Sequence, residues 1–170
     1  MKLFIVGHGR HGKDTVAEFI RDKYGLTFKS SSFFCAEHVV RPFLEEHDIT
    51  YRSTQECFDD RANHRELWYQ AIKRYNKDDV SRLSKAIFNE HDMYVGIRDR
   101  TEFLESKHLA DLAIWVDAFE RVPAVDPTCK ILRSDCDVIF DNNGTEEELL
   151  AKVARFFNLI TPIKLDNSWT

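Results

Sequence analysis

The stretch from Lys2 to Thr15, KLFIVGHGRHGKDT, limits the fold of this chain more than any other. It begins with a continuous apolar run, Leu3 to Val6, which is typical of a strand buried on both faces of a parallel sheet. The next segment, Gly7 to Lys13, fits the spacing G-x-x-x-x-G-K of a phosphate-binding loop. Because such a loop joins a strand to a helix, the stretch predicts a strand-loop-helix unit that binds phosphate groups.

The residues of this loop have separate roles in binding a nucleoside triphosphate. Glycines let the backbone turn tightly and bring its N–H groups onto phosphate oxygens. The N-terminus of the following helix adds a partial positive charge, and the lysine reaches the β- and γ-phosphates. We therefore expect ATP to be bound by Gly7, Gly9, Arg10, His11, Gly12, Lys13, Asp14 and Thr15, with Lys13 and Asp14 also catalytic.

The magnesium position departs from the usual pattern. Asp14 stands where Ser or Thr normally ligates the ion, and Thr15 follows it. Two arrangements stay open: either the Thr15 hydroxyl is the ligand, or Asp14 acts on the metal through a water molecule. We expect Mg²⁺ as the cofactor and these two residues as its protein ligands, with Asp99 and Asp117 as alternatives if neither serves.

Composition narrows the class of protein. The chain has 170 residues, of which 43% are hydrophobic and 31% charged, which suits one domain with a sizeable core. No apolar run approaches the ~20 residues that span a bilayer, and the N-terminus lacks a signal-peptide pattern, so we expect a cytoplasmic protein without membrane partners. The net charge of −5 gives no general support for nucleic-acid binding, although it does not exclude a local basic cleft. The cysteines lack metal-site spacing, which favours free thiols over a zinc site.

Strand and helix patterns alternate along the whole chain. Strands are expected at 3–6, 26–29, 92–97, 112–116 and 137–140. Helices are expected at 14–24, 33–47, 78–89, 101–108 and 145–157. Thr145 and Glu148 fit a capping box at the start of the last helix. This alternation predicts an α/β fold with a five-stranded parallel sheet.

Two segments resemble a known family. GKDT at 12–15 and DVIFDNNGTEEEL at 137–149 resemble the P-loop nucleotide kinases, in particular the phage-type deoxynucleoside monophosphate kinases. The second segment is also similar to dephospho-CoA kinase. The resemblance implies a three-layer P-loop NTPase fold with strand order 2-3-1-4-5. It also implies that adenine packs against the loop of Asn142, Asn143 and Gly144.

The same resemblance implies roles for arginines at the ends of two strands. Arg98 follows the strand at 92–97 and would bind the acceptor phosphate during catalysis. The alternative there is a salt-bridged loop in which Thr101 caps the next helix. The connection 118–133 corresponds to a short lid, where Arg121 would cover the transferred group and contact ATP, with Lys130 and Arg133 as further candidates.

The polar and aromatic segment at 48–90 predicts a helical acceptor-binding insertion within a single kinase domain, 1–170. Trp68 and Tyr69 are expected in its core. Its charged cluster is either a solvated helix face or part of the acceptor site. Because arginines bind phosphate bidentately, we favour the acceptor site for Arg61 and Arg65. A hydroxyl acceptor would need a base, for which the candidates are Asp59 and Asp60.

Three functions are compatible with these patterns. We favour ATP-dependent phosphorylation of a deoxynucleoside monophosphate. The second function is phosphorylation of the hydroxymethyl group of 5-hydroxymethyluracil in phage DNA, which a short lid and an open cleft would suit. The third is a non-catalytic nucleotide-binding module. The expected partners are thus ATP and a nucleotide or a DNA base, in the host cytoplasm if a phage encodes the protein. The sequence does not fix the oligomeric state.

Overall fold

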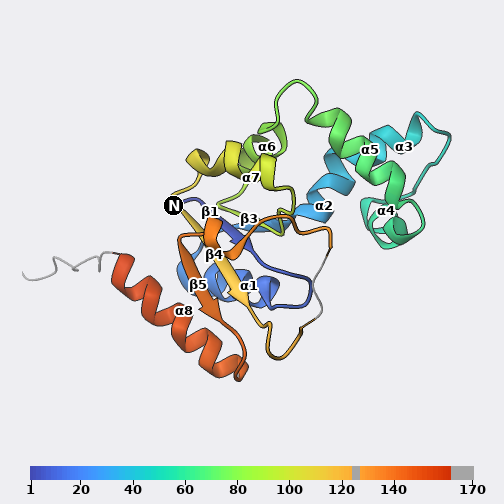
Figure 1. Cartoon of the computed structure of the whole chain (residues 1–170). Coiled ribbons are helices and arrows are strands. Elements are labelled where there is room, and N and C mark those ends of the chain that lie inside the picture. Colours follow the sequence, from blue (N-terminus) through green and yellow to red (C-terminus); the bar gives the residue numbers. More distant parts are fainter. Residues whose placement is uncertain (124–126, 162–170) are drawn as a thin grey trace, which may run out of the picture.

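Five parallel strands form the central sheet of this computed structural model, which describes residues 1–123 and 127–161 (Figure 1). The strands are β1 (Leu3–Val6), β2 (Phe28–Ser30), β3 (Met93–Val95), β4 (Leu112–Asp117) and β5 (Val138–Asp141). Their spatial order is β2-β3-β1-β4-β5, which confirms the expected α/β fold and strand order. β1 lies in the middle, where Leu3 is paired with Met93 on one side and with Leu112 on the other.

Helices cover both faces of the sheet. Their bounds are α1 (Lys13–Tyr24), α2 (Ser31–Cys35), α3 (Arg41–Glu45), α4 (Thr54–Asp59), α5 (Arg65–Tyr75), α6 (Arg82–Glu90), α7 (Arg100–Ser106) and α8 (Glu146–Ile160). Short helical turns are η1 (Ala36–Val40), η2 (Asp60–Ala62), η3 (Lys107–Leu109) and η4 (Arg133–Asp135). In Figure 1, α1 and α8 lie below the sheet and the other labelled helices lie above it or beyond its edge. Among the described residues, no helix is long and apolar enough to cross a membrane.

The alternation of side chains along β1 divides the core in two. Leu3 and Ile5 point toward α1 and α8, whereas Phe4 and Val6 point toward the helices on the opposite face. All four side chains are fully buried, because successive residues of a strand face opposite sides and both sides are covered. The continuous apolar run in the sequence is therefore explained by burial on both faces.

The helix expected at 33–47 forms a continuous run from Ser31 to Glu45, but its middle, Ala36–Val40, is π-helical. Pro42 accounts for the wider turn. Proline has no N–H to donate to the carbonyl four residues earlier, and its ring pushes that carbonyl away. The helix predicted from the apolar pattern is thus continuous, but one proline widens its middle turn.

Two expectations for the inserted helices are wrong in detail. Trp68 and Ala71 of α5 are buried, but Tyr69 is 61% exposed. Residues three and four apart share a helix face, so the next position after Trp68 is turned toward solvent. α6 begins at Arg82 rather than near 78, because the Asn76 side chain accepts a hydrogen bond from the Leu83 N–H at 3.1 Å and holds a turn there.

The cysteines form no disulfide within the described residues. Cys35, Cys57 and Cys129 are buried and Cys136 is half-buried.

One carboxyl group lies inside the helical face of the core. Glu102 of α7 is 5% exposed. It accepts hydrogen bonds from the Ser84 hydroxyl at 2.9 Å, the Tyr94 hydroxyl at 3.3 Å and the Asn76 amide at 3.3 Å. Burial raises the pKa of Glu102 to about 7, although these hydrogen bonds oppose the shift.

This carboxyl group should make stability depend on pH. Between pH 4.5 and about 7 the folded protein keeps a proton on Glu102 that the unfolded chain has lost, so the stability from this group falls as pH rises. Glu102→Gln removes the titration. We expect the stability of this variant, relative to wild type, to increase by on the order of 3 kcal/mol across that interval. Urea unfolding at a series of pH values measures the difference.

Glu105→Gln is the matched control, because Glu105 lies on the same helix with its side chain exposed. Both variants lose a glutamate carboxyl group, so a pH-dependent gain in stability seen only in Glu102→Gln is due to burial of that group. Parallel pH profiles for Glu102→Gln and wild type would show that the buried carboxyl group does not titrate as described.

Candidate functional site

The loop between β1 and α1 turns sharply where the strand ends. Its φ angles are positive at Gly7 (146°), Arg10 (63°) and Gly12 (93°). Gly7 passes so close to β4 that a Cβ atom there would lie 2.5 Å from the carbonyl oxygen of Val116. Only glycine fits this contact, so the first glycine of the sequence pattern is needed for packing between strands as well as for the turn.

α1 begins at the end of this loop with an uncapped N-terminus. Gly12 is its N-cap, and no side chain accepts a hydrogen bond there. The first amides of a helix have no partners within the helix and attract anions. The Lys13 ammonium group donates a hydrogen bond to the His8 carbonyl oxygen at 2.6 Å, so this cation lies against the loop. The local arrangement therefore suits a phosphate group.

His11 ties the loop to two other segments. The side chain is 1% exposed. Its Nδ1 accepts a hydrogen bond from the Ala118 N–H at 3.1 Å, and its Nε2 lies 3.1 Å from the Val122 carbonyl oxygen. The first contact needs a lone pair on Nδ1 and the second needs a proton on Nε2, which fixes the tautomer. The His11 carbonyl oxygen accepts a hydrogen bond from Asn142 Nδ2 at 2.9 Å.

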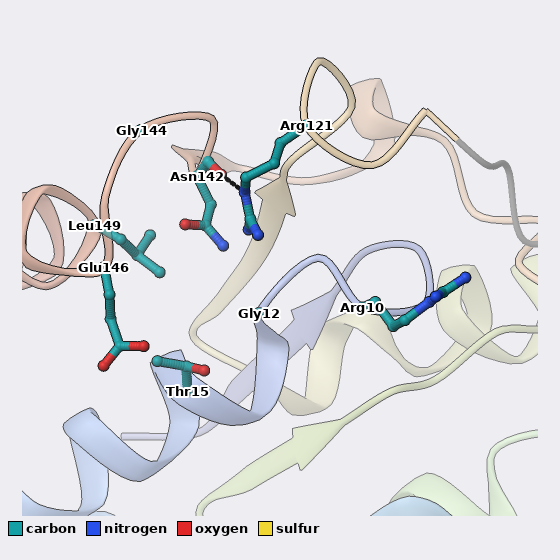
Figure 2. Close-up of a pocket in the computed structure, with 8 residues that line it drawn as sticks. All are labelled: Arg10, Gly12, Thr15, Arg121, Asn142, Gly144, Glu146 and Leu149. Atoms are coloured by element: carbon teal, nitrogen blue, oxygen red, sulfur yellow. Dashed lines mark hydrogen bonds between the residues drawn. The ribbon is translucent and has the colours of Figure 1, made fainter.

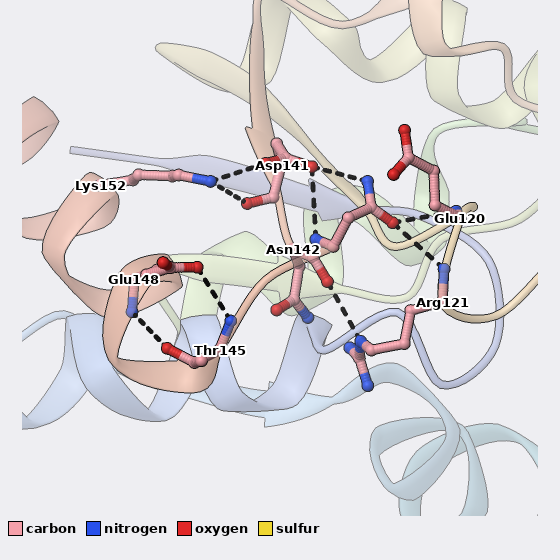
Figure 3. Close-up of polar contacts among 8 residues, drawn as sticks. Glu120, Arg121, Asp141, Asn142, Thr145, Glu148 and Lys152 are labelled. Carbon is pink, nitrogen blue, oxygen red and sulfur yellow. Dashed lines mark hydrogen bonds and ion pairs between the residues drawn. The ribbon is translucent and has the colours of Figure 1, made fainter.

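The loop after β5 bonds to the turn after β4 (Figure 3). Asn143 Oδ1 accepts hydrogen bonds from the backbone N–H groups of Glu120 at 2.9 Å and Arg121 at 3.4 Å. In return, Arg121 Nε donates to the Asn142 carbonyl oxygen at 3.3 Å. The two loops are thereby held against each other beside the phosphate-binding loop.

The capping box predicted at the start of α8 is present. The Glu148 N–H donates to the Thr145 hydroxyl at 3.2 Å, and the Thr145 N–H donates to the Glu148 carboxylate at 3.0 Å. A Cβ atom at Gly144 would lie 1.8 Å from that carboxylate. Gly144 therefore leaves room for the cap that fixes where the helix starts.

A pocket of about 220 Å³ lies between the phosphate-binding loop and the start of α8 (Figure 2). Six of the residues that we expected in an ATP site line it, namely Arg10, Gly12, Thr15, Arg121, Asn142 and Gly144. Two further lining residues, Glu146 and Leu149, were missed. The capping box could have indicated both, because it places Glu146 in the first turn of the helix and Leu149 on its inward face.

The residues considered for magnesium differ in their surroundings. Thr15 lines the pocket, and Asp14 is exposed in the first turn of α1. Across 1–123 and 127–161, no three His, Cys, Asp or Glu side chains are grouped so that they could hold a metal ion. Mg²⁺ in phosphate-binding sites is held by one or two protein groups together with phosphate oxygens and water. A hydroxyl group beside the phosphate loop fits such an ion.

The two alternative carboxylates are engaged elsewhere. Asp99 Oδ1 accepts a hydrogen bond from the Glu102 N–H at 2.8 Å and caps α7, so Asp99 rather than Thr101 is the cap. Asp117 accepts a hydrogen bond from the Phe119 N–H at 3.0 Å, and its other oxygen lies 3.4 Å from Arg133.

Arg98 lies after β3, the strand next to β1. Its side chain is exposed and donates a hydrogen bond to the Thr128 hydroxyl. Its carbonyl oxygen accepts a hydrogen bond from the Lys130 N–H at 2.8 Å. Arg100 instead forms a bidentate ion pair with Asp135, with both distances at 2.8 Å. The connection expected to be a lid thus contacts the end of β3, although its residues 124–126 lie outside the described residues, as does the tail 162–170.

The predicted carboxylates at 48–90 line a second pocket and the predicted arginines do not. The Arg61 guanidinium lies 4.0 Å from the centre of the Phe58 ring and donates to the Phe58 carbonyl oxygen at 2.8 Å. Arg65 is exposed at the start of α5. Neither lines the second pocket, an open hollow of about 670 Å³ bounded by Tyr51, Ser53, Gln55, Glu56, Asp59 and Asp60.

The two aspartates of this hollow have different environments. Asp60 accepts hydrogen bonds from the Tyr51 hydroxyl at 2.7 Å and from Asn63, and these bonds lower its pKa. His64 lies 3.1 Å from the same carboxylate. Asp59 accepts one hydrogen bond from Gln55 at 2.8 Å. Because a lowered pKa makes a weaker base, Asp60 is a poor proton acceptor.

Comparison with known proteins places the chain by fold rather than by sequence. No protein-family model and no curated protein match it, whereas 21 chains of solved structures do. TT1252 from Thermus thermophilus is 14% identical with a TM-score of 0.55, and the match covers 95% of this chain and 98% of that one. This likeness, together with the phosphate loop after β1, gives the expected three-layer P-loop fold.

Two further solved structures are similar at lower TM-scores. Shikimate kinase from Aquifex aeolicus is 13% identical with a TM-score of 0.49, covering 93% of this chain and 96% of that one. A sugar kinase from Janibacter sp. is 14% identical with a TM-score of 0.47, covering 94% and 95%.

The contact between Gly12 and Asn142 gives a test of the pocket. A Cβ atom at Gly12 would lie 2.5 Å from Asn142 Nδ2, so Gly12→Ala must displace the amide that bonds to His11. We expect ATP binding, measured by calorimetry, to weaken about tenfold or more. Gly25→Ala is the control, since Gly25 also has a positive φ (72°) but nothing lies within 4 Å of an added Cβ. Equal ATP affinity in the two variants would mean that this contact does not shape the site.

Proposed function

We propose that this protein transfers a phosphoryl group from ATP to an acceptor that carries a deoxynucleoside. The observation that carries the proposal is the pocket beside the phosphate-binding loop. Its lining includes two arginines, Arg10 and Arg121, and the Thr15 hydroxyl, next to the uncapped start of α1. Cations, a hydroxyl and helix amides together suit a nucleoside triphosphate rather than an uncharged ligand.

Phosphoryl transfer needs positioning and charge neutralisation more than covalent catalysis. The loop N–H groups and Lys13 would hold the β- and γ-phosphates of ATP. Arg121 would bind phosphate oxygens at the pocket, and Asn142 and Gly144 would border the base. Thr15 and Asp14 would hold Mg²⁺, which neutralises the charge on the transferred group when bound.

A deoxynucleoside monophosphate is the acceptor that we favour. Arg98 supports this choice because it follows β3, the strand that is paired with β1, and is exposed there. In a parallel sheet ligands bind at the carboxyl ends of the strands, so Arg98 and the phosphate loop lie at the same edge. Arg65 and Arg61 are further cations on the insertion that an acceptor phosphate can recruit.

One observation favours the second candidate, phosphorylation of a hydroxymethyl group on a base in DNA. The hollow in the insertion is lined by Glu56, Asp59 and Asp60, and three carboxylates repel a phosphate. A hydroxyl acceptor needs a proton acceptor instead, and Asp59 would fill that role. Arg61 and Arg65, which do not line the hollow, would then contact the DNA backbone.

The role of Lys13 can be tested by substitution. Lys13→Ala should abolish phosphoryl transfer without unfolding the protein, because the side chain contributes charge to the site rather than packing in the core. Lys23→Ala removes a lysine at the exposed end of the same helix and should leave the rate unchanged. A coupled assay of ADP release measures both variants. Normal turnover by Lys13→Ala would remove the loop from the mechanism.

The acceptor can be identified by offering each candidate substrate in a separate assay. Radiolabelled ATP is offered to the purified protein with each deoxynucleoside monophosphate, and separately with duplex DNA that contains 5-hydroxymethyluracil. We expect label in a deoxynucleoside diphosphate, and Arg98→Ala should raise KM for the monophosphate about tenfold or more by removing a charged hydrogen bond.

Each other outcome has a defined meaning. Label found only in DNA, and lost in Asp59→Asn, would establish the second candidate and reject the first. ATP binding without transfer to any acceptor would indicate a non-catalytic nucleotide-binding module.

A further inference from the structure

The three segments around the nucleotide pocket meet at one buried side chain, His11. Its imidazole bonds to the turn after β4 at Ala118 and Val122, and its carbonyl oxygen bonds to Asn142 of the loop after β5. The ring is 1% exposed, and the His8 ring lies 5.3 Å away at 78° to it. A residue within the phosphate-binding loop thus holds two segments that lie more than a hundred positions away in the sequence.

The turn at 118–122 is compact, and His11 contacts both of its ends. The Val122 and Arg121 N–H groups both donate to the Ala118 carbonyl oxygen, at 2.7 Å and 3.1 Å. The imidazole accepts from the Ala118 N–H and faces the Val122 carbonyl oxygen, each at 3.1 Å. Two hydrogen bonds from one rigid ring therefore set the orientation of the whole turn.

Arg121 lies within this turn, and its side chain lines the nucleotide pocket (Figure 2). Its Nε donates to the Asn142 carbonyl oxygen at 3.3 Å, a long hydrogen bond that by itself holds the side chain weakly. The terminal guanidinium nitrogens form no hydrogen bond with any residue of 1–123 or 127–161. The direction of this cation therefore depends on where the turn places its backbone.

We infer that His11 is a positioning residue that fixes the turn at 118–122 and so holds Arg121 over the nucleotide. The effect on ATP binding rests on the proposed function. The two hydrogen bonds between His11 and the turn, called the clasp below, can be tested without a nucleotide. A histidine that only filled space could be replaced by any ring of similar size. A positioning residue needs its acceptor and its donor in place, so the two roles predict different results.

Three substitutions separate the two hydrogen bonds. His11→Asn keeps an acceptor near Nδ1, and His11→Gln keeps a donor near Nε2. His11→Phe keeps a ring but neither bond. His47→Phe is the control, because His47 Nδ1 also bonds to a carbonyl oxygen, that of Phe43 at 2.9 Å, but at the end of α3.

The first experiment is hydrogen exchange on the ligand-free protein. In His11→Phe the amides of Ala118, Arg121 and Val122 should exchange about tenfold faster than in wild type. His11→Asn should restore protection at Ala118, since its side chain can still accept that N–H. His11→Gln should not restore protection at Ala118, since its amide donor replaces only the bond to the Val122 carbonyl oxygen. Unchanged exchange in all three variants would overturn the inference, and His11→Asn and His11→Gln decide the matter if the phenylalanine variant does not fold.

The second experiment is a double-mutant cycle on ATP affinity, measured by calorimetry. His11→Phe should weaken ATP binding about tenfold when Arg121 is present. In an Arg121→Ala background the same change should have less than about a twofold effect, because residues that act through one another are not additive. Equal effects in both backgrounds would overturn the inference. A wild-type protein that does not bind ATP would refute the proposed function, while hydrogen exchange would still test the clasp.

Discussion

The close contact between Gly7 and the carbonyl oxygen of Val116 is the constraint on which the arrangement of the site depends. β1 is paired with a strand on each side, and its apolar side chains are fully buried. The loop after it therefore starts from the buried centre of the sheet. Because Gly7 has no side chain, the backbone can pass directly against β4. The loop then reaches the turn after β4 and the start of α8 after β5. Larger side chains at this point would move the loop away from both.

The pocket beside the loop and the hollow in the insertion have opposite charge. Two cations, Arg10 and Arg121, and one carboxylate, Glu146, line the first, whereas three carboxylates, Glu56, Asp59 and Asp60, line the second. An excess of one sign of charge in a concave surface raises the local concentration of ligands of the other sign. These charges favour an anion beside the loop over one at the hollow, even though the chain as a whole carries a net charge of −5.

The parts of the structure that could be predicted are the elements whose conformation is determined by residues close together in the sequence. The run Leu3 to Val6 and the glycine spacing after it indicated a central strand and its loop, and Thr145 with Glu148 indicated the start of α8. The order of the five strands followed from the family resemblance. A shift of one position along a helix was enough to misplace Tyr69, because each residue turns the side chain by about a quarter of a circle.

Contacts between distant parts of the chain could not be predicted in the same way. His11 reads as an ordinary variable position of the loop, and its partners are 107 and 111 residues away. The helix expected at 33–47 gave no indication of the π-helical turn at Ala36–Val40. The sequence likewise grouped Asp59, Asp60, Arg61 and Arg65 as one charged cluster, whereas folding places the two carboxylates on the hollow and leaves the two arginines off it.

Arg10 adopts a left-handed backbone conformation, with φ of 63°. This conformation costs a residue with a side chain about 1 kcal/mol or more in free energy, and costs glycine almost nothing. A loop selected for backbone shape alone would have glycine at this position, between two others that are already present in the pattern. The chain instead retains a long cation there, on the rim of the pocket, at the expense of its own stability. Strain of this kind gathers where proteins act on ligands, and it marks position 10 as one where the side chain matters more than the ease of folding.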